Sequence, residues 1–117
     1  MSVQEKRVAD YVAIHLGLDV LFLVPNRQKG TSTPDIEMAG LRWEIKSPSG
    51  KSSRTIENNL RSALRQSANI ILDLRQMDGR IPTKKLLLDA EHRFINAKKI
   101  SRLIVITKEQ KHVDFRR

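Results

Sequence analysis

Residues 34–46, which read PDIEMAGLRWEIK, decide the fold of this chain. In the second half of this stretch apolar and polar residues alternate, which is the pattern of a half-buried strand. Successive side chains of a strand point to opposite faces, so Trp43 and Ile45 share one face while Glu44 and Lys46 share the other. We therefore expect Trp43 and Ile45 to enter the core, and Glu44 and Lys46 to stand side by side on the opposite face.

The same stretch predicts a hairpin. Strands are expected over residues 35–38 and 41–47, joined by a turn at residues 39–40, which are Ala-Gly. A turn of this kind brings the two strands alongside each other, so the carboxylate of Asp35 can approach that of Glu44. The sequence thus predicts two carboxylates and a lysine at one place on a sheet.

This combination of groups suits metal-assisted hydrolysis of a phosphodiester. Mg²⁺ and Mn²⁺ prefer oxygen ligands, which Asp35, Glu44 and the backbone carbonyl of Ile45 could supply. Such a metal lowers the pKa of a bound water and neutralises charge that develops on a phosphate. Lys46 would orient or deprotonate that water, or stabilise the anionic transition state. The alternative is an ordinary hairpin whose outer face carries a glutamate–lysine pair.

Outward from this hairpin, the rest of the chain predicts an α/β fold in one domain, residues 1–117. Apolar residues recur at helical spacing in three segments, and short continuous apolar runs indicate buried strands between them. The sheet should therefore be mixed and covered by helices on both faces. The final ten residues predict either a short strand or a frayed end. The expected helices span residues 3–16, 55–68 and 83–97, and the further strands 20–24, 69–74 and 103–107.

Composition favours a polyanionic partner. The chain has 22 Lys and Arg against 13 Asp and Glu, a net charge of +9, which favours nucleic acid first and an anionic membrane second. It has no cysteine, which excludes disulfides, thiolate zinc sites and cysteine nucleophiles. No apolar run approaches the roughly 18 residues of a membrane span. We expect a soluble protein that binds nucleic acid and does not enter a membrane.

The predicted helix over residues 55–68 carries a basic stripe. Arg54, Asn58, Arg61 and Arg65 recur at helical spacing opposite the apolar face, and such a stripe could follow a phosphate backbone. A merely solvated helix face explains the same pattern equally well. Aromatic residues are few, which argues against a stacking platform for single strands and favours recognition through phosphates or shape.

The motif Pro34-Asp35 followed by Glu44-Ile45-Lys46 resembles the signature of the PD-(D/E)XK nuclease superfamily. The resemblance implies a restriction-endonuclease-like core, with the element order αβββαβ and here an added αβ unit. It also implies that Asp35 and Glu44 bind the metal and that Lys46 assists the attacking water. A glutamate of the first helix often completes such sites, and Glu5 is the best match in this chain.

A narrower resemblance covers residues 30–107. The stretches WEIKSP at 43–48, LRQ at 64–66 and NIILDL at 69–74 are similar to the C-terminal tRNA-nuclease domains of contact-dependent growth-inhibition (CdiA) toxins. The resemblance implies that Ser47 and Gln66 lie at the edge of the active site. It further implies tRNA as substrate, a cognate immunity protein as partner, and action in the cytoplasm of a target cell.

Two other functions remain open at this stage. One is a DNA endonuclease of the same fold, and the other is a non-catalytic nucleic-acid-binding module that keeps the fold. The presence of Asp35, Glu44 and Lys46 together speaks against the loss of catalysis.

Overall fold

The structure is a computed structural model that describes residues 3–24, 34–50 and 54–117. The expected order of helices and strands is confirmed, and the final ten residues do add a strand. The elements are α1 (Val3–His15), β1 (Val20–Phe22), β2 (Ile36–Met38), β3 (Leu41–Lys46), α2 (Arg54–Leu64), β4 (Asn69–Asp73), α3 (Thr83–Asn96), β5 (Arg102–Ile106) and β6 (His112–Arg116).

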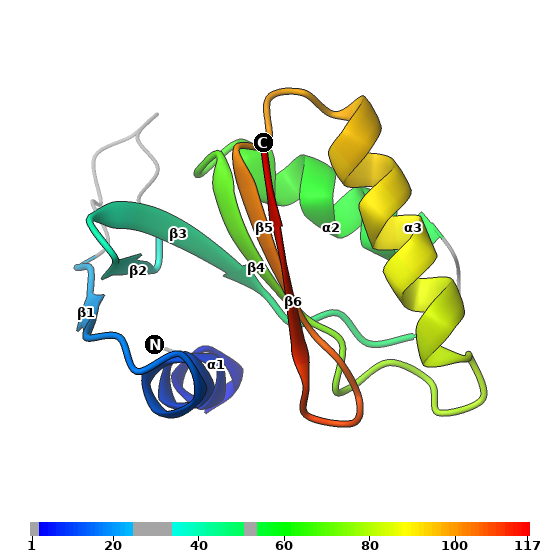
Figure 1. Cartoon of the computed structure of the whole chain (residues 1–117), viewed down its shortest axis with the longest axis horizontal. Helices are drawn as coiled ribbons and strands as arrows, with labels where there is room; N and C mark the ends of the chain where they lie inside the picture. Colours follow the sequence, from blue (N-terminus) through cyan, green and yellow to red (C-terminus); the bar gives the residue numbers. More distant parts are fainter. Residues whose placement is uncertain (1–2, 25–33, 51–53) are drawn as a thin grey trace.

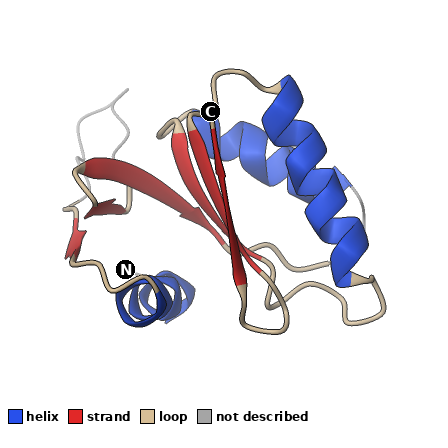
Figure 2. Ribbon diagram, viewed as in Figure 1, coloured by secondary structure: helices blue, strands red, loops and turns tan. Residues whose placement is uncertain are grey.

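The strands form one six-stranded mixed sheet in the order β1-β2-β3-β4-β5-β6. The strand β3 pairs parallel with β4, and β4 pairs parallel with β5, while the pairs at either end of the sheet are antiparallel. Figure 1 shows α1 on one side of this sheet and α2 with α3 on the other, and Figure 2 shows the same layers by element type. The predicted α/β architecture with helices on both faces is therefore confirmed.

Each face of the sheet has its own apolar core, because the central strands are apolar on both sides. On β4, Ile71 packs with α1 through Val8 and Val12, whereas its neighbours Ile70 and Leu72 pack with α2 and α3. This explains why β4 has a continuous apolar sequence rather than an alternating one. The hairpin strand β3 does alternate, and Trp43 and Ile45 lie in the α1 core as expected.

The prediction of a buried strand over residues 20–24 was wrong. Only Val20–Phe22 form a strand, and this strand lies at the edge of the sheet with β2 as its single neighbour. Leu21 is 61% exposed, Phe22 46% and Val24 86%. The apolar run correctly indicated a strand, but burial depends on the position of that strand in the sheet.

The helix α2 ends at Leu64, earlier than predicted, and Ser67 lies in the turn that follows it. The hydroxyl of Ser67 donates to the carbonyl of Arg42 at 2.6 Å and accepts from the amide of Asn69 at 3.0 Å. These bonds tie the turn after the helix to the start of β4 and to β3. Within the described residues, no helix is long and apolar enough to cross a membrane.

Candidate active site

The hairpin turn places Asp35 opposite Glu44, as the sequence predicted. Ile36 pairs with Trp43 and Met38 with Leu41, so Asp35, which precedes β2, falls opposite Glu44. The Oδ2 atom of Asp35 also accepts a hydrogen bond from the amide of Ile45 at 2.9 Å. Ile45 therefore joins the site through its amide, which fixes the position of the Asp35 carboxylate.

Burial of Trp43 fixes the strand that carries Glu44. The indole is 0% exposed, its Nε1–H donates to the carbonyl of Met38 at 2.9 Å, and the guanidinium of Arg102 lies 5.0 Å from the ring centroid. Because neighbouring side chains alternate, Glu44 must then stand on the other face of the sheet. It lies there beside Ile70, on the side that α2 covers.

Glu44 has an unusual electrostatic environment. The residue is only 7% exposed. Burial raises the pKa of Glu44 to about 8, the negative charge of Asp35 and a hydrogen bond to it act in the same direction, and Lys46 opposes them. The Nζ atom of Lys46 lies 3.6 Å from Oε2 of Glu44. The two carboxyl groups and the lysine therefore form one interacting cluster, in which the ionised form of Glu44 is disfavoured.

An open cleft of about 360 Å³ adjoins this cluster at the end of β3. Its lining comes from three elements. Glu5 lies on α1, Asn59 lies on α2, and Lys46 and Ser47 lie at the end of β3. The remaining lining residues are Gln4 and Ile45. Three elements that are distant in the sequence thus meet at Lys46. Glu5 lies in the same cleft as Lys46.

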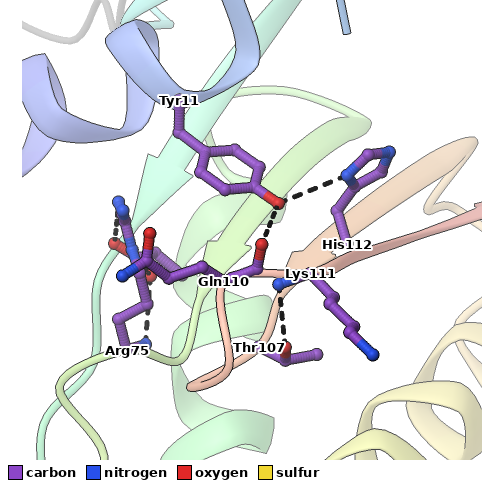
Figure 3. Close-up of polar contacts among 7 residues, drawn as sticks. Tyr11, Arg75, Thr107, Gln110, Lys111 and His112 are labelled. Atoms are coloured by element: carbon purple, nitrogen blue, oxygen red, sulfur yellow. Dashed lines mark hydrogen bonds and ion pairs between the residues drawn. The ribbon is translucent and has the colours of Figure 1, made fainter. Parts of the chain in front are cut away.

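The position of Glu5 depends on how α1 is held, and Tyr11 holds it. The Tyr11 hydroxyl donates to the carbonyl of Gln110 at 2.9 Å and lies 3.3 Å from Nδ1 of His112, which joins α1 to the β5–β6 hairpin (Figure 3). The guanidinium of Arg75 lies 5.3 Å from the centroid of the Tyr11 ring. Arg75 is itself held by a two-point ion pair with Asp73, whose side chain is buried.

Ser47 and Asn59 contribute neutral polar groups to the cleft. The Oγ atom of Ser47 is buried and has no hydrogen-bond partner within the described parts of the chain. Asn59 was not among the residues predicted for the site. The sequence feature that could have identified Asn59 is its position on the helix, roughly 200° around the axis from Arg61 and therefore on a different face.

The predicted basic stripe is exposed but faces away from this cleft. Arg61 pairs with Glu57 at 2.9 Å, and Glu57 also pairs with Arg93 of α3 at 2.8 Å, so Arg61 turns toward α3. Arg54 lines a different cavity of about 330 Å³, which lies between α2 and α3.

Two further predicted residues follow α2. Arg65 and Gln66 lie in the turn after this helix, with Arg65 exposed and Gln66 half-buried. Gln66 is not among the described residues that line the cleft beside Lys46. Of the residues predicted for nucleic-acid binding, the structure thus brings Ser47 to the cleft and leaves Arg54, Arg61 and Gln66 outside its lining.

The donor set fits a hard divalent cation. The described residues contain no group of three or more His, Cys, Asp or Glu side chains that could hold a metal. Mg²⁺, however, needs only one or two protein carboxylates, because it keeps several waters and takes further ligands from substrate phosphates. Asp35 and Glu44 could provide such a pair.

Comparisons with known proteins were consistent with this architecture. The sequence model of a family described as the contact-dependent growth inhibition CdiA C-terminal domain matches residues 32–112. The fold is similar to that of a chain in a solved structure described as a CdiA-CT/CdiI toxin and immunity complex from Burkholderia pseudomallei. That match has a TM-score of 0.72 and 19% identity, and it covers 98% of this chain and 83% of the other. At this identity the likeness shows the fold alone. No curated protein sequence matches the chain.

Proposed function

Since this chain belongs to the contact-dependent growth inhibition CdiA C-terminal domain family, we propose that it is a toxin domain that hydrolyses phosphodiester bonds in RNA. Transfer RNA is the favoured substrate. The observation that carries the proposal is the buried Glu44 carboxyl against Asp35, with the Lys46 ammonium 3.6 Å away, beside an open cleft. The arrangement supports assignment to the PD-(D/E)XK type of nuclease.

Each residue of the cluster has a distinct role in this proposal. Asp35 and Glu44, with the backbone carbonyl of Ile45, would hold Mg²⁺ or Mn²⁺, which when bound supplies an acidified water and offsets charge on the phosphate. Lys46 is placed to orient the attacking water or to stabilise negative charge as it develops. Glu5 would complete the site from α1.

Nucleic-acid binding is assigned to the basic and polar surface around this cluster. The net charge of +9 favours a polyanion, and Arg54, Arg61 and Arg65 are exposed along and after α2. We assign these arginines to phosphates distant from the bond that is cut, because Arg54 and Arg61 lie outside the cleft lining. Ser47 contacts the substrate within the cleft, and Gln66 contacts it beyond the end of α2.

A cognate immunity protein is the expected protein partner. The structurally similar protein was solved as a toxin and immunity complex. A partner that blocks a surface with this excess of positive charge should be acidic where it binds. The proposed site of action is the cytoplasm of the target cell, into which the domain would be delivered.

The proposal is tested by incubating the protein with total tRNA and with plasmid DNA, each with Mg²⁺, Mn²⁺ or EDTA. We expect metal-dependent cutting of tRNA that Asp35→Ala and Lys46→Ala each reduce at least about 100-fold, the scale of a lost acid–base or charge-stabilising group. Lys98→Ala, at an exposed position after α3, is the matched control and should cut like the wild type.

The other outcomes separate the alternatives. Cutting of DNA alone would show a DNA endonuclease of the same fold. Binding of tRNA without cutting, unchanged by Asp35→Ala and Lys46→Ala, would show a non-catalytic binding module and overturn the enzymatic proposal.

A further inference from the structure

The cleft beside Lys46 has little positive charge. Among the described residues that line it, Lys46 is the one cation and Glu5 is a carboxylate, whereas Gln4, Ser47 and Asn59 are uncharged hydrogen-bonding residues. A phosphate calls for cations, but ribose hydroxyls and base edges call for neutral donors and acceptors. The cleft is therefore built to bind the part of a nucleotide that adjoins the phosphate rather than a second phosphate.

Asn59 presents a fixed acceptor to this cleft. Its Nδ2 group donates to the carbonyl of Thr55 one helical turn earlier, at 2.7 Å. This bond fixes the orientation of the amide and leaves Oδ1 as the atom that can accept. No described residue donates a hydrogen bond to that oxygen.

Ser47 adds a second group that needs a partner. Its Oγ atom is buried without a hydrogen bond from or to any residue in the described ranges. A buried hydroxyl without a partner is costly, and the cost is relieved when a ligand supplies the missing bond. Ser47 directly follows Lys46 in the chain, so it lies one residue beyond the cluster that would hold the reacting phosphate.

We propose that Asn59 and Ser47 bind the ribose of the nucleotide at the cut position and thereby distinguish RNA from DNA. The Oδ1 atom of Asn59 accepts a hydrogen bond from the 2′-hydroxyl, and the Ser47 hydroxyl donates to the same 2′-oxygen. A 2′-hydroxyl both donates and accepts, and it is the group that separates RNA from DNA. The inference rests on the proposed function, because the phosphate must lie at Asp35, Glu44 and Lys46 for the sugar to reach the cleft.

The test uses a short RNA that the wild type cuts at a mapped position, and the same RNA with a single 2′-deoxy nucleotide on the 5′ side of the cut bond. Because water is the nucleophile in the proposed reaction, the deoxy substrate can still be cut. We expect the wild type to cut the all-ribose substrate at least about three- to tenfold faster, because each neutral hydrogen bond contributes a factor of this size. Asn59→Ala and Ser47→Ala should each slow cutting of the all-ribose substrate and lower the ratio of the two rates.

Asn58→Ala is the matched control. Asn58 is the same residue type on the same helix, but it is exposed on the solvent side. It should leave the ratio of the two rates unchanged. Alanine is a better helix former than asparagine, so neither substitution is expected to unfold α2.

The possible failures are distinguishable. The inference is overturned if Asn59→Ala leaves the ratio of the all-ribose rate to the deoxy rate unchanged, or if Asn58→Ala lowers that ratio equally. In either case, loss of cutting in Lys46→Ala would still support the proposed nuclease activity. If the wild type cuts no RNA, the proposed function fails, and binding then decides the inference. Fluorescence anisotropy would compare the all-ribose strand with an all-deoxy strand of the same sequence. A ribose preference that Asn59→Ala removes supports the inference, and equal affinities overturn it.

Discussion

At the scale of single residues, Glu44 is the group that most clearly departs from ordinary behaviour. Its carboxyl is buried on the sheet and faces a second carboxyl, so burial and the charge of Asp35 both disfavour ionisation. Structural ion pairs can also shift a pKa, but here the shifted group lies beside a cleft and next to a lysine. This combination is characteristic of functional carboxylates.

The raised pKa predicts a pH-dependent stability. The pKa of Glu44 rises from 4.5 to about 8, so between these values the folded state holds a proton that the unfolded state has lost. The free energy of unfolding should therefore fall as the pH rises through this window, by at most about 1.4 kcal/mol per pH unit. Glu44→Gln keeps a neutral group of the same shape and should remove this dependence, which urea unfolding from pH 5 to 9 would measure.

The control for this prediction is Glu91→Gln, at an exposed position of α3. It should reproduce the wild-type curve of stability against pH. Parallel curves for the wild type and Glu44→Gln would contradict the assigned pKa shift.

At the scale of elements, the β2–β3 hairpin has a suboptimal turn residue. Ala39 and Gly40 both have positive φ angles, 54° and 75°. A two-residue turn of this kind favours Asn-Gly, and an alanine in the left-handed region costs roughly 1–2 kcal/mol. We expect Ala39→Asn to raise the free energy of unfolding by about 0.5–1 kcal/mol. Gly40→Ala should lower it, and the two effects can be compared by urea unfolding.

The end of α3 depends on Arg117. Its guanidinium donates to the backbone carbonyls of Phe94, Ala97 and Ile100, and lies 4.3 Å from the centroid of the Phe94 ring. Carbonyls at the end of a helix have no partner within the helix, and a cation there also interacts favourably with the helix dipole.

Arg117→Ala should therefore lower the free energy of unfolding by about 1–2 kcal/mol. The neighbouring Arg116 pairs with Asp114 on the surface, with its side chain 65% exposed. Arg116→Ala should cost less than about 0.5 kcal/mol. Equal losses in the two variants would refute the capping role of Arg117.

The elements also show what the sequence could and could not predict. The alternation around Trp43 and Glu44 is local, so the face of each residue followed directly from the strand period. The exposure of Phe22 was not predictable in this way, because it depends on which strand forms the edge of the sheet. Asn59 was missed for a similar reason, since the face of α2 that meets the cleft is decided by how α1 packs on the other side.

At the scale of the whole molecule, α1 and the C-terminal hairpin are coupled through Tyr11. Tyr11→Phe removes the hydrogen bond to Gln110 and the contact with His112 while keeping the ring in place. We expect a loss of about 1 kcal/mol in the free energy of unfolding. Amide hydrogen exchange should be faster along α1, including near Glu5, while β4 stays protected. Unchanged exchange in α1 would show that apolar packing alone holds this helix.

The charge of the molecule predicts how its binding to tRNA responds to salt. Arg61→Ala and Arg65→Ala should each weaken binding and reduce the slope of log affinity against log salt concentration by roughly one unit or less. Slopes identical to that of the wild type in both variants would show that these arginines are solvated and do not contact the phosphates of the RNA.

The strand order carries a consequence for how the chain reaches this structure. The strands lie in the sheet in the same order as along the chain, so each pairs only with its neighbours in sequence and none has to insert between two that are already paired. Contacts between neighbours in sequence require little loop closure and favour rapid folding. The sheet can thus grow strand by strand along the chain. The contact of Tyr11 with Gln110 spans 99 residues, so it can form only after β5 and the turn that follows it are present. The Glu5 side of the cleft would then be completed last, and the domain would gain its full active site only at the end of folding.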